Sequence, residues 1–463
     1  MTDDAVQQFD SDLVKAFAEQ SGDYNPIHVD AIAARRLLYG GCIVHGALLT
    51  WWALALVAER IGKPVGLTTL KASFKSPVMV GETVSAEPAS DGDNWTIRIR
   101  RGDRLVARVD VTTGDAEGDR LLPPRKVSAV CRELGDNDMA DASGGAPLAG
   151  GDPSTSFPAL GLIPVRQTAI IAAASRIVGM ECPGRHSVFS ELRLTFAGAP
   201  DDVLSYRVRR WEPRFRMVSL ALSGAATGEI TAFVRPSPVA QPSISSLSGL
   251  IRSDLFAGAR ALVVGGSRGL GELLAKLFVT AGGAATLTYA RGIEDARKVA
   301  DDINRTFPDR ATTTRFDVTA PDLPALSGPY THVFYCASPK ILAQPGDTWS
   351  DAEFQRYRKV YVDGLRVAVE RAAAALVPDA FVVNLSSVYA EDPPAAFAEY
   401  GKAKAESERT CLEAAARAGL TGVNWRLPRL RTDQTQSLTP EDPDDPLPVL
   451  IARLENMAAA ARR

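Results

Sequence analysis

The stretch ALVVGGSRGLGELLAKLF, residues 261–278, constrains the fold of this chain more than any other. It has the pattern of a buried strand, a glycine-rich turn and a helix. Its glycines let the backbone come close to a pyrophosphate, which the positive end of a helix attracts. Around it, residues 257–463 alternate apolar strand patterns with longer helical patterns. This alternation predicts an α/β domain with a doubly wound parallel sheet.

The rest of the chain divides into two further blocks. At 463 residues the chain is too long for one hydrophobic core. Stretches rich in Gly, Asp, Ser and Pro predict linkers at residues 119–157 and 239–256. We therefore expect domains at residues 1–118, 158–238 and 257–463. The first two each show a helical pattern followed by four strand patterns, which predicts a helix wrapped by an antiparallel meander, occurring twice.

Charge and apolar patterning exclude several classes of partner. The 52 basic and 55 acidic residues nearly balance, and no basic run is long enough to follow a phosphate backbone, so we expect no nucleic-acid partner. The longest apolar stretch, residues 46–58, is too short to cross a bilayer and predicts a buried helix. The start of the chain lacks a signal-peptide pattern, so a cytoplasmic protein without a membrane partner is expected.

Cysteine and histidine spacing argues against a metal site. The five cysteines are odd in number and form no CxxC pair, which favours reduced thiols over a disulfide framework or a zinc site. The four histidines are not spaced to share a metal ion.

The stretch SGDYNPIHVD, residues 21–30, places Asp23, Asn25 and His28 on one turn. Alone, Asp23 would fit a turn or capping residue, and His28 a structural histidine. The stretches GGCIVHGALL at residues 40–49 and SFKSPVMVGETV at 73–84 follow it in order. Together the three stretches resemble the (R)-specific enoyl thioester hydratases and dehydratases of the MaoC-like family, over most of residues 10–115.

This resemblance implies the hotdog fold, a long helix cradled by a curved antiparallel sheet. It implies Asp23 as the base that takes a proton from water, and His28 as its partner in water activation and proton return, with dehydration as the reverse reaction. A helix that begins within IVHG has unpaired N–H groups, and Gly46 lets a thioester oxygen approach them. Asn25 would hold the loop through local hydrogen bonds.

Other polar residues of the first block have plainer interpretations. We interpret His45, at the expected helix start, as a packing or capping residue. Arg35 and Arg36 either meet phosphates of coenzyme A or of phosphopantetheine, or form a solvated charged face.

The second block lacks the D-x-N-P-x-H pattern, and His186 has no companion aspartate at that spacing. We interpret residues 158–238 as a degenerate second hotdog that pairs with the first, replaces the second subunit of a dimer and shapes the acyl tunnel. The alternative is an unrelated β-rich domain.

Downstream of the glycine turn, the stretch VVNLSSVYAEDPPAAFAEYGKAK at residues 382–404 carries Ser387, Tyr400 and Lys404. These spacings resemble the short-chain dehydrogenases/reductases, over nearly all of residues 257–435, although Tyr-x-x-x-Lys also occurs on helices by chance. Tyr400 and Lys404 share a helix face, so the ammonium is expected to lower the tyrosine pKa toward that of a working proton donor. Ser387 would hydrogen-bond the substrate carbonyl. The expected fold class is thus an α+β double hotdog followed by an α/β Rossmann domain.

The same resemblance implies a set of cofactor-binding residues. Arg268 and Arg291 supply cations where an NAD enzyme usually has an acidic residue, so the cofactor is expected to be NADPH. Asp317 resembles the family's adenine contact. The full expected set is Gly265, Ser267, Arg268, Gly269, Leu270, Gly271, Arg291, Asp317, Val318, Ala337, Pro428 and Thr432.

Three stretches depart from the pattern of this second family. The chain reads YCASP at residues 335–339 where the family has Asn-Asn-Ala-Gly. The helix asparagine of the proton relay is replaced by Tyr361 or its role is taken over by Asp363. Arg429 stands where glycine is usual, and Thr432 comes one residue early.

Together the halves predict a bifunctional enzyme. It would reduce a 3-ketoacyl thioester with NADPH and dehydrate the (R)-3-hydroxyacyl thioester to the trans-2-enoyl thioester, in fatty-acid-like or polyketide biosynthesis. Alternatives are an (R)-specific enoyl-CoA hydratase and 3-hydroxyacyl-CoA dehydrogenase running oxidatively, a hydratase with an inactive reductase domain, and a non-catalytic acyl-carrier docking protein. We expect the acyl chain on coenzyme A or acyl carrier protein, and a homo-oligomer formed through the reductase domain.

Overall fold

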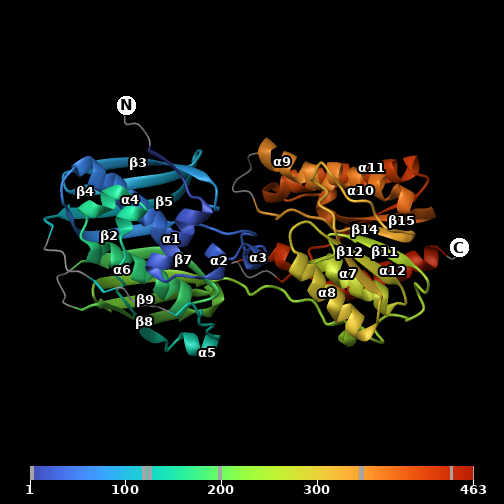
Figure 1. Cartoon of the computed structure of the whole chain (residues 1–463), viewed down its shortest axis with the longest axis horizontal. Coiled ribbons are helices and arrows are strands. Elements are labelled where there is room, and N and C mark those ends of the chain that lie inside the picture. The colour runs from blue at the N-terminus through green and yellow to red at the C-terminus, as the bar shows by residue number, and fades with distance from the viewer. Residues whose placement is uncertain are drawn as a thin grey trace. The chain divides into compact units, whose positions relative to one another are not determined.

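The computed structural model describes residues 5–116, 122–123, 128–196, 201–343, 349–437 and 442–461. The chain forms two compact units, and the boundary between them falls between Ser237 and Pro238 (Figure 1).

Within the described residues, the first unit contains one ten-stranded antiparallel sheet. The sheet order is β1-β3-β4-β5-β2-β7-β10-β9-β8-β6, so the pairing in the second half mirrors that in the first. The halves join where β2 pairs with β7, with Leu70 opposite Leu194. The strands are β1 (Ala5–Gln8), β2 (Gly66–Phe74), β3 (Thr83–Asp91), β4 (Asn94–Arg101), β5 (Arg104–Gly114), β6 (Ser143–Pro147), β7 (Ser187–Thr195), β8 (Val203–Glu212), β9 (Met217–Gly224) and β10 (Thr227–Val234).

The simple meander predicted for each half is wrong. In both halves the first long strand pairs with the last one, β2 with β5 and β7 with β10. This arrangement leaves the other edge of β2 free to pair with β7, so that, in the described part of the unit, the short strands β1 and β6 form the edges of the sheet. One continuous sheet therefore serves both halves.

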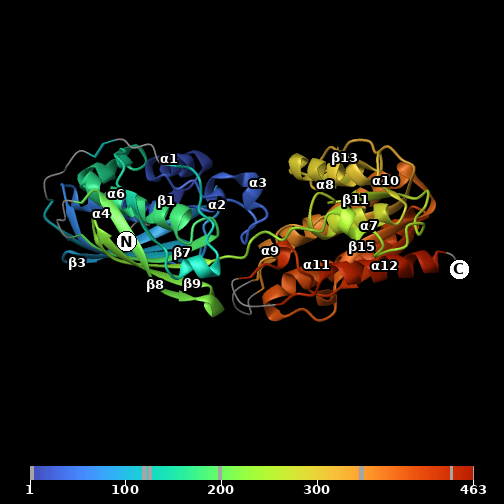
Figure 2. The same ribbon diagram turned by 90° about the horizontal axis from the view of Figure 1, so that it is seen from below.

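Two long helices lie on the same face of this curved sheet (Figure 2). The first, α4 (Gly46–Ile61), is buried from Ala47 to Ala58, as its apolar sequence predicts, and ends at Gly62 in the left-handed conformation (φ 68°). The second, α6 (Val165–Arg176), continues into a π-helical turn, Ile177–Glu181. The Trp51 indole N–H on α4 donates to the Thr168 carbonyl on α6 at 3.2 Å. Among the described residues, no helix combines the length and apolarity that a membrane span requires.

Several short helices complete the first unit. They are α1 (Ser11–Ser21), α2 (Pro26–Val29), α3 (Ala31–Ala34), α5 (Asp136–Met139) and the 3-10 turns Pro153–Thr155, Pro158–Leu162 and Pro213–Phe215. Part of the segment expected as a linker at residues 119–157 is therefore structured. Strand β6 pairs with β8, and Met139 and Leu148 are buried in the common core. Strand β6 was not predicted because glycine and proline are unfavourable in most strands and are tolerated at a sheet edge.

The second unit contains a six-stranded parallel sheet of order β13-β12-β11-β14-β15-β16, within the described residues. This confirms the predicted doubly wound sheet. The strands are β11 (Arg260–Val264), β12 (Ala284–Tyr289), β13 (Ala311–Arg315), β14 (Tyr330–Tyr335), β15 (Leu376–Ser387) and β16 (Thr421–Leu427). The helices are α7 (Gly269–Thr280), α8 (Ile293–Thr306), α9 (Asp351–Arg358), α10 (Leu365–Ala372), α11 (Ala398–Arg417) and α12 (Pro446–Ala460), with a π-helical turn at Lys359–Gly364 and 3-10 turns at Ala373–Ala375, Val388–Ala390, Ala395–Phe397 and Asp433–Thr435.

The helices cover both faces of this sheet. Helices α7, α8 and α12 pack on one face and α10 and α11 on the other. Residues 239–256 were expected as a linker, but Ile244 and Leu247 of the 3-10 turn Ile244–Leu247 are buried in the same core as α7, α8 and α12. Lys276 on α7 donates to the Pro242 carbonyl at 2.9 Å and fixes this segment.

Candidate active sites

The loop that carries Asp23 is shaped by the residues on either side of it. Helix α1 ends at Gly22, which adopts the left-handed conformation (φ 71°). Three residues later Asn25 caps the single turn α2, since its side-chain oxygen accepts from the Ile27 N–H at 3.2 Å and Pro26 stands at the first helical position. The left-handed Gly22 and the turn capped by Asn25 together bring the side chains of Asp23 and His28 close to each other.

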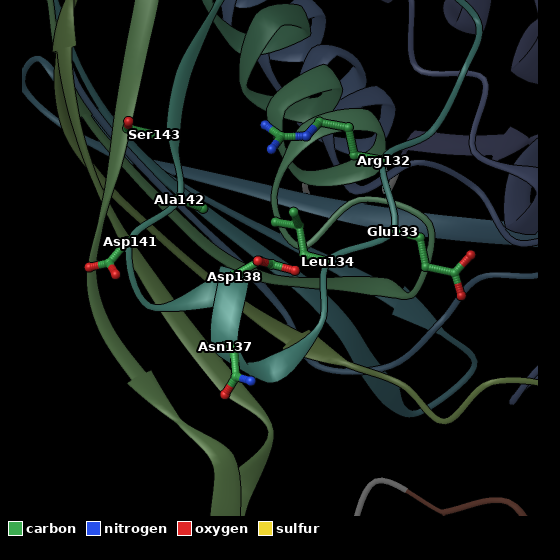
Figure 3. A pocket seen from close by; sticks show the side chains of 8 residues that line it. All are labelled: Arg132, Glu133, Leu134, Asn137, Asp138, Asp141, Ala142 and Ser143. Atoms are coloured by element: carbon green, nitrogen blue, oxygen red, sulfur yellow. The ribbon is translucent and has the colours of Figure 1, made fainter.

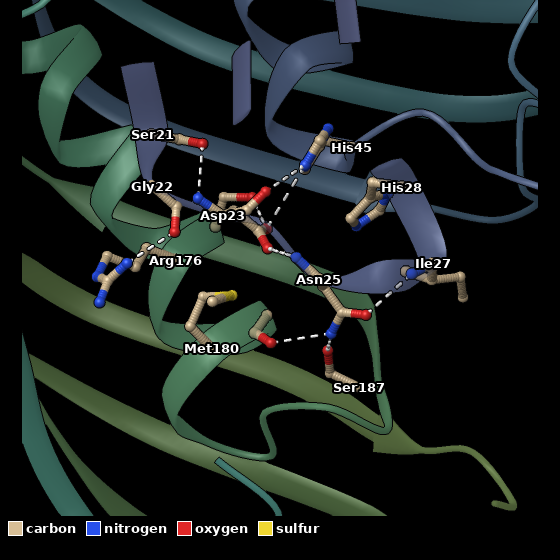
Figure 4. Close-up of polar contacts among 12 residues, drawn as sticks. Ser21, Gly22, Asp23, Asn25, Ile27, His28, His45, Arg176, Met180 and Ser187 are labelled. Carbon is tan, nitrogen blue, oxygen red and sulfur yellow. Dashed lines mark hydrogen bonds and ion pairs between the residues drawn. The ribbon is translucent and has the colours of Figure 1, made fainter. Parts of the chain in front are cut away.

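The Asp23 carboxylate is almost fully buried, with 2% of the residue exposed. Figure 4 shows it near Asn25 and His45. Its Oδ2 accepts from the Ser175 hydroxyl at 2.7 Å, and its Oδ1 accepts from the Asn25 backbone N–H at 3.2 Å. Burial raises the pKa of Asp23, and the charge of His28 and the Ser175 hydrogen bond act in the opposite direction. The carboxylate therefore lies in a setting that favours proton uptake.

The His28 imidazole is held in one tautomer. Its Nδ1 lies 2.8 Å from the Ile43 carbonyl oxygen, so Nδ1 carries the hydrogen and Nε2 keeps its lone pair. Burial lowers the pKa of His28, and the Asp23 carboxylate opposes this shift. A carboxylate oxygen of Asp23 and a ring nitrogen of His28 lie within 4.8 Å of each other. One water molecule can bridge that distance.

The start of α4 lies next to this pair. Its N-cap residue, His45, stacks on the His28 ring with centroids 3.7 Å apart and donates from Nε2 to the Asp23 carbonyl at 3.0 Å. The first N–H groups of the helix have no acceptor within it. A Cβ atom on Gly46 would lie 2.7 Å from the Phe74 ring, so a larger residue at this first helical position would require that ring to move.

The second half of the first unit holds the Asp23 loop from the other side. The Asn25 side-chain amide lies within hydrogen-bond distance of the Gly179, Gly184 and Arg185 carbonyls, at 2.9, 3.2 and 3.3 Å. Arg176 donates to the Gly22 carbonyl at 2.7 Å. The loop is therefore braced mainly by long-range contacts, besides the local bonds expected of Asn25.

The glycine turn of the second unit packs closely. A Cβ atom on Gly265 (φ 84°) would lie 2.8 Å from the Ala337 nitrogen, and one on Gly271 would lie 2.3 Å from the Gly265 carbonyl oxygen. Helix α7 begins at Gly269, directly after Arg268. The turn therefore presents the N–H groups of a helix start, which suits a pyrophosphate.

The other expected cofactor residues lie at the carboxyl ends of the strands, where ligands bind in open parallel sheets. Asp317 follows β13 and accepts from the Thr319 N–H at 3.0 Å, and Arg291 is exposed just after β12. Ala337 and Pro428 follow β14 and β16, Val318 packs beside Gly364, Thr432 caps the turn Asp433–Thr435, and Ser267 and Leu270 belong to the glycine turn and α7. This donor set fits a dinucleotide.

Ser387, Tyr400 and Lys404 are brought together at the same edge. Ser387 ends β15, and Tyr400 and Lys404 lie on α11, each at most 9% exposed. Lys404 donates to the Leu385 carbonyl at 2.7 Å. Burial raises the pKa of Tyr400 to about 12, against a lowering effect of the Ser387 hydrogen bond. Burial also lowers the pKa of Lys404 to about 7.

Comparisons with known proteins match both units. Residues 4–113 match the model of the MaoC like domain, and residues 259–326 match that of the short chain dehydrogenases. The (R)-specific enoyl-CoA hydratase of Aeromonas caviae is 38% identical over 82 residues, which are 18% of this chain and 61% of that protein. The chain joins a MaoC-like domain to a short-chain dehydrogenase domain.

A second curated relative matches the same kind of domain. The mitochondrial 3-hydroxyacyl-[acyl-carrier-protein] dehydratase of Arabidopsis thaliana is 32% identical over 76 residues, which are 16% of this chain and 45% of that protein. The chain thus spans less than two thirds of the length of either relative. Among solved structures, the oxidoreductase yciK from E. coli is 19% identical, with 46% of this chain and 94% of that chain covered and a TM-score of 0.41.

In the MaoC-like domain, His45 was predicted only to pack or to cap the helix, and its contact with Asp23 was not predicted. The residue packs on Phe17 as expected, but its side chain makes no capping hydrogen bond, and its Nε2 holds the Asp23 carbonyl instead. Sequence reasoning also missed Ser175 and Arg176, because the second half carries no motif that points to them.

The Asp23, His28 and His45 side chains are close enough to hold a metal ion, but their hydrogen bonds favour proton handling. His45 uses its Nε2 hydrogen toward Asp23, and its Nδ1 is buried with no partner in the described part of the chain. His28 uses its Nδ1 hydrogen toward Ile43. His45 therefore has no lone pair on the side that faces Asp23.

His186 and a nearby pocket lie outside this site. His186 pairs with Glu133 at 2.8 Å, and its partner is thus not an aspartate. The pocket shown in Figure 3 contains none of the expected site residues; its lining is Arg132, Glu133, Leu134, Asn137, Asp138, Asp141, Ala142 and Ser143.

In the short-chain dehydrogenase domain, the expected effect of Lys404 on Tyr400 is wrong. The Tyr400 pKa lies above its usual value of 10, because burial outweighs every other influence on it. Of the two candidates for the relay position, Tyr361 contacts Lys404, whereas Asp363 pairs with Arg366 at 2.7 Å.

Proposed function

We propose that the MaoC-like domain hydrates and dehydrates an acyl thioester at Asp23 and His28. The observation that carries this proposal is the close approach of the buried carboxylate and the imidazole, within 4.8 Å, beside the start of α4. The curated relatives named above are a hydratase and a dehydratase of such thioesters.

In hydration, the water oxygen adds to C3 of the enoyl thioester and a proton adds to C2. The Asp23 carboxylate takes a proton from water, which His28 orients by accepting a hydrogen bond at Nε2. This proton then passes from Asp23 to His28 Nε2, and His28 returns it to C2, so that both residues end in their starting forms. The first N–H groups of α4 stabilise the enolate oxygen. Dehydration follows the same path in reverse.

We further propose that the first unit is a double hotdog, in which the second half is a degenerate copy of the first. The mirrored strand order and the matching positions of α4 and α6 support this interpretation. The second half replaces the second subunit of a dimer and shapes the acyl tunnel.

The short-chain dehydrogenase domain is proposed to reduce a 3-ketoacyl thioester with NADPH. The cofactor supplies the hydride to C3. Tyr400 donates a proton to the forming alkoxide, Ser387 hydrogen-bonds the carbonyl oxygen, and Lys404 holds positive charge beside them. Arg268 in the glycine turn and Arg291 after β12 favour a cofactor with a 2′-phosphate.

Together the two domains would carry out successive steps, since the reductase product is the (R)-3-hydroxyacyl substrate of the dehydratase. We propose that the acyl chain is carried by coenzyme A or acyl carrier protein, and that the protein forms a homo-oligomer through its reductase domain. The pathway would be fatty-acid-like or polyketide biosynthesis.

One experiment tests both steps. The protein is supplied with a 3-ketoacyl thioester and NADPH, and products are followed by mass. Tyr400→Phe should block all conversion, whereas Asp23→Asn should stop the reaction at the hydroxyacyl thioester. Enoyl product from Asp23→Asn would refute the assignment of the first site.

A second candidate is an active hydratase with an inactive reductase domain. The high pKa of Tyr400, about 12, favours it, because a phenol so weakly acidic is a poor proton donor at neutral pH. Failure of the wild-type protein to oxidise NADPH in the presence of a 3-ketoacyl thioester, with hydration intact, would select this candidate.

A further inference from the structure

The Ser175 side chain, from the second half, makes a shorter hydrogen bond to the Asp23 carboxylate than the Asn25 backbone N–H does, 2.7 Å against 3.2 Å. Ser175 lies on α6, is 2% exposed, and donates from Oγ to Asp23 Oδ2 at 2.7 Å. A hydroxyl that donates to an ionised carboxylate in a buried setting forms a strong, charge-assisted bond. This bond fixes one oxygen of the carboxylate.

Gly179 faces the other oxygen. It lies in the π-helical turn that follows α6, and a Cβ atom on it would lie 2.0 Å from Asp23 Oδ1. Its carbonyl also accepts from the Asn25 side chain at 2.9 Å. The turn therefore leaves a space that fits the carboxylate and no additional methyl group. Turns of this π-helical kind occur frequently at functional sites.

We propose that Ser175 and Gly179 are positioning residues of the hydration site, so that the half without its own acid–base pair completes the site of the other half. This inference rests on the proposed function of Asp23. Ser175 orients the carboxylate and favours its ionised form, and Gly179 makes room for it. The second half is thereby retained for the chemistry as well as for the fold.

A pH profile separates this role from simple packing. The titratable and charged groups around Asp23 are His28 from α2, His45 from the start of α4, Arg176 from α6 and Cys131. All of them remain when the Ser175 hydroxyl is removed. The Asp23 pKa then rises further, because the bond that favours the ionised form is lost. Hydration needs the ionised form of Asp23. Without the Ser175 hydroxyl, the hydration rate should therefore begin to rise at a higher pH than in the wild type.

The test uses the full chain and an enoyl thioester whose hydration is followed by absorbance. Ser175→Ala and Ser175→Cys should both lower kcat/KM about tenfold and move its acidic limb up by about one pH unit. Cysteine keeps the volume but is a weak donor, so a wild-type profile in Ser175→Cys would overturn the role of the hydrogen bond. Ser219→Ala, on β9 rather than on α6, serves as the matched control.

Gly179→Ala should abolish hydration while circular dichroism and thermal unfolding of the full chain show that the first unit keeps its fold. Full hydration activity in this variant would overturn the steric role. Asp23→Asn separates the two levels of inference. If Asp23→Asn still hydrates, the proposed function fails; if it is inactive while the Ser175 and Gly179 variants behave as wild type, only the present inference fails.

Discussion

The Lys404 ammonium lies 3.8 Å from the ring centroid of Tyr361 and 5.9 Å from that of Tyr400. A cation over an aromatic face is attracted by the ring, so Tyr361 favours the charged form of this buried lysine. The Tyr361 hydroxyl in turn lies 2.6 Å from the Ser338 hydroxyl, in the loop that departs from the family pattern. Two departures from that pattern are therefore coupled around one lysine.

Replacement of Tyr361 separates its ring from its hydroxyl. Tyr361→Phe keeps the ring and should reduce 3-ketoacyl thioesters within about twofold of wild type, whereas Tyr361→Leu should lose about tenfold at neutral pH. The Lys404 pKa of about 7 would fall further in Tyr361→Leu, so Lys404 loses its proton at a lower pH. The basic limb of the activity profile of this variant should therefore shift to lower pH. The pH profile of NADPH oxidation checks this. Equal profiles for the two variants would contradict the cation–π interpretation.

Lys404 should also make the stability of its domain depend on pH. Burial lowers its pKa from 10.5 to about 7 in the folded protein, so folding releases a proton between these values. Stability contributed by this group is present above pH 10.5 and falls as the pH drops toward 7. Lys404→Met removes the effect. The quantity to compare is the unfolding free energy of Lys404→Met minus that of the wild type. This difference should be larger at pH 7 than at pH 10, by up to about 4 kcal/mol. Denaturant titrations at the two pH values measure this difference, and a constant difference would refute it.

The contact between Gly46 and Phe74 predicts a steric effect at the start of α4. Gly46→Ala places a methyl group 2.7 Å from the ring and should destabilise the first unit by about 1–3 kcal/mol. Adding Phe74→Leu should restore most of the stability. Hydration should stay low in the double variant, because the methyl group still blocks the thioester oxygen from the helix N–H groups. Recovery of hydration together with stability would argue against that binding mode.

His45 offers a further test at the hydration site. His45→Phe keeps an aromatic ring against Phe17 and His28 but removes the Nε2 donor to the Asp23 carbonyl. A buried carbonyl without a donor costs about 1–3 kcal/mol, so kcat/KM for hydration should fall about tenfold or more. His186→Gln, at a histidine outside the site, should leave hydration within about twofold of wild type. Steady-state hydration rates of the two variants provide the comparison.

Much of the local structure follows from sequence patterns. The apolar run of residues 46–58 predicts α4, because it is bounded by a histidine–glycine start and by Gly62. Local patterns also predict that a turn starting at Asn25-Pro26 separates Asp23 from His28, that Gly265 follows a strand and that Tyr400 lies on a helix, as the structure has them.

Long-range contacts and buried charges were not predictable in the same way. The bond between Ser175 and Asp23 joins residues 152 positions apart, and a single serine in an apolar helix carries no signal of it. Strand β13 was not predicted because its sequence, with TTTR, is polar. The edge strand β6 was not predicted because it contains two glycines. Lys404 was expected to act on Tyr400, but the sequence did not show that Tyr361 would offer the ammonium a closer ring.

The pairing of β2 with β7 has a consequence for the whole molecule. Because both strands belong to one polypeptide, the half with the reactive pair and the half that supports it always occur in equal numbers, at a local concentration that dilution cannot lower. Two separate subunits would dissociate at low concentration and lose an active site to which both contribute. Turnover per chain in hydration should therefore stay constant across dilution, and a chain altered in its second half cannot be rescued by mixing with an intact one.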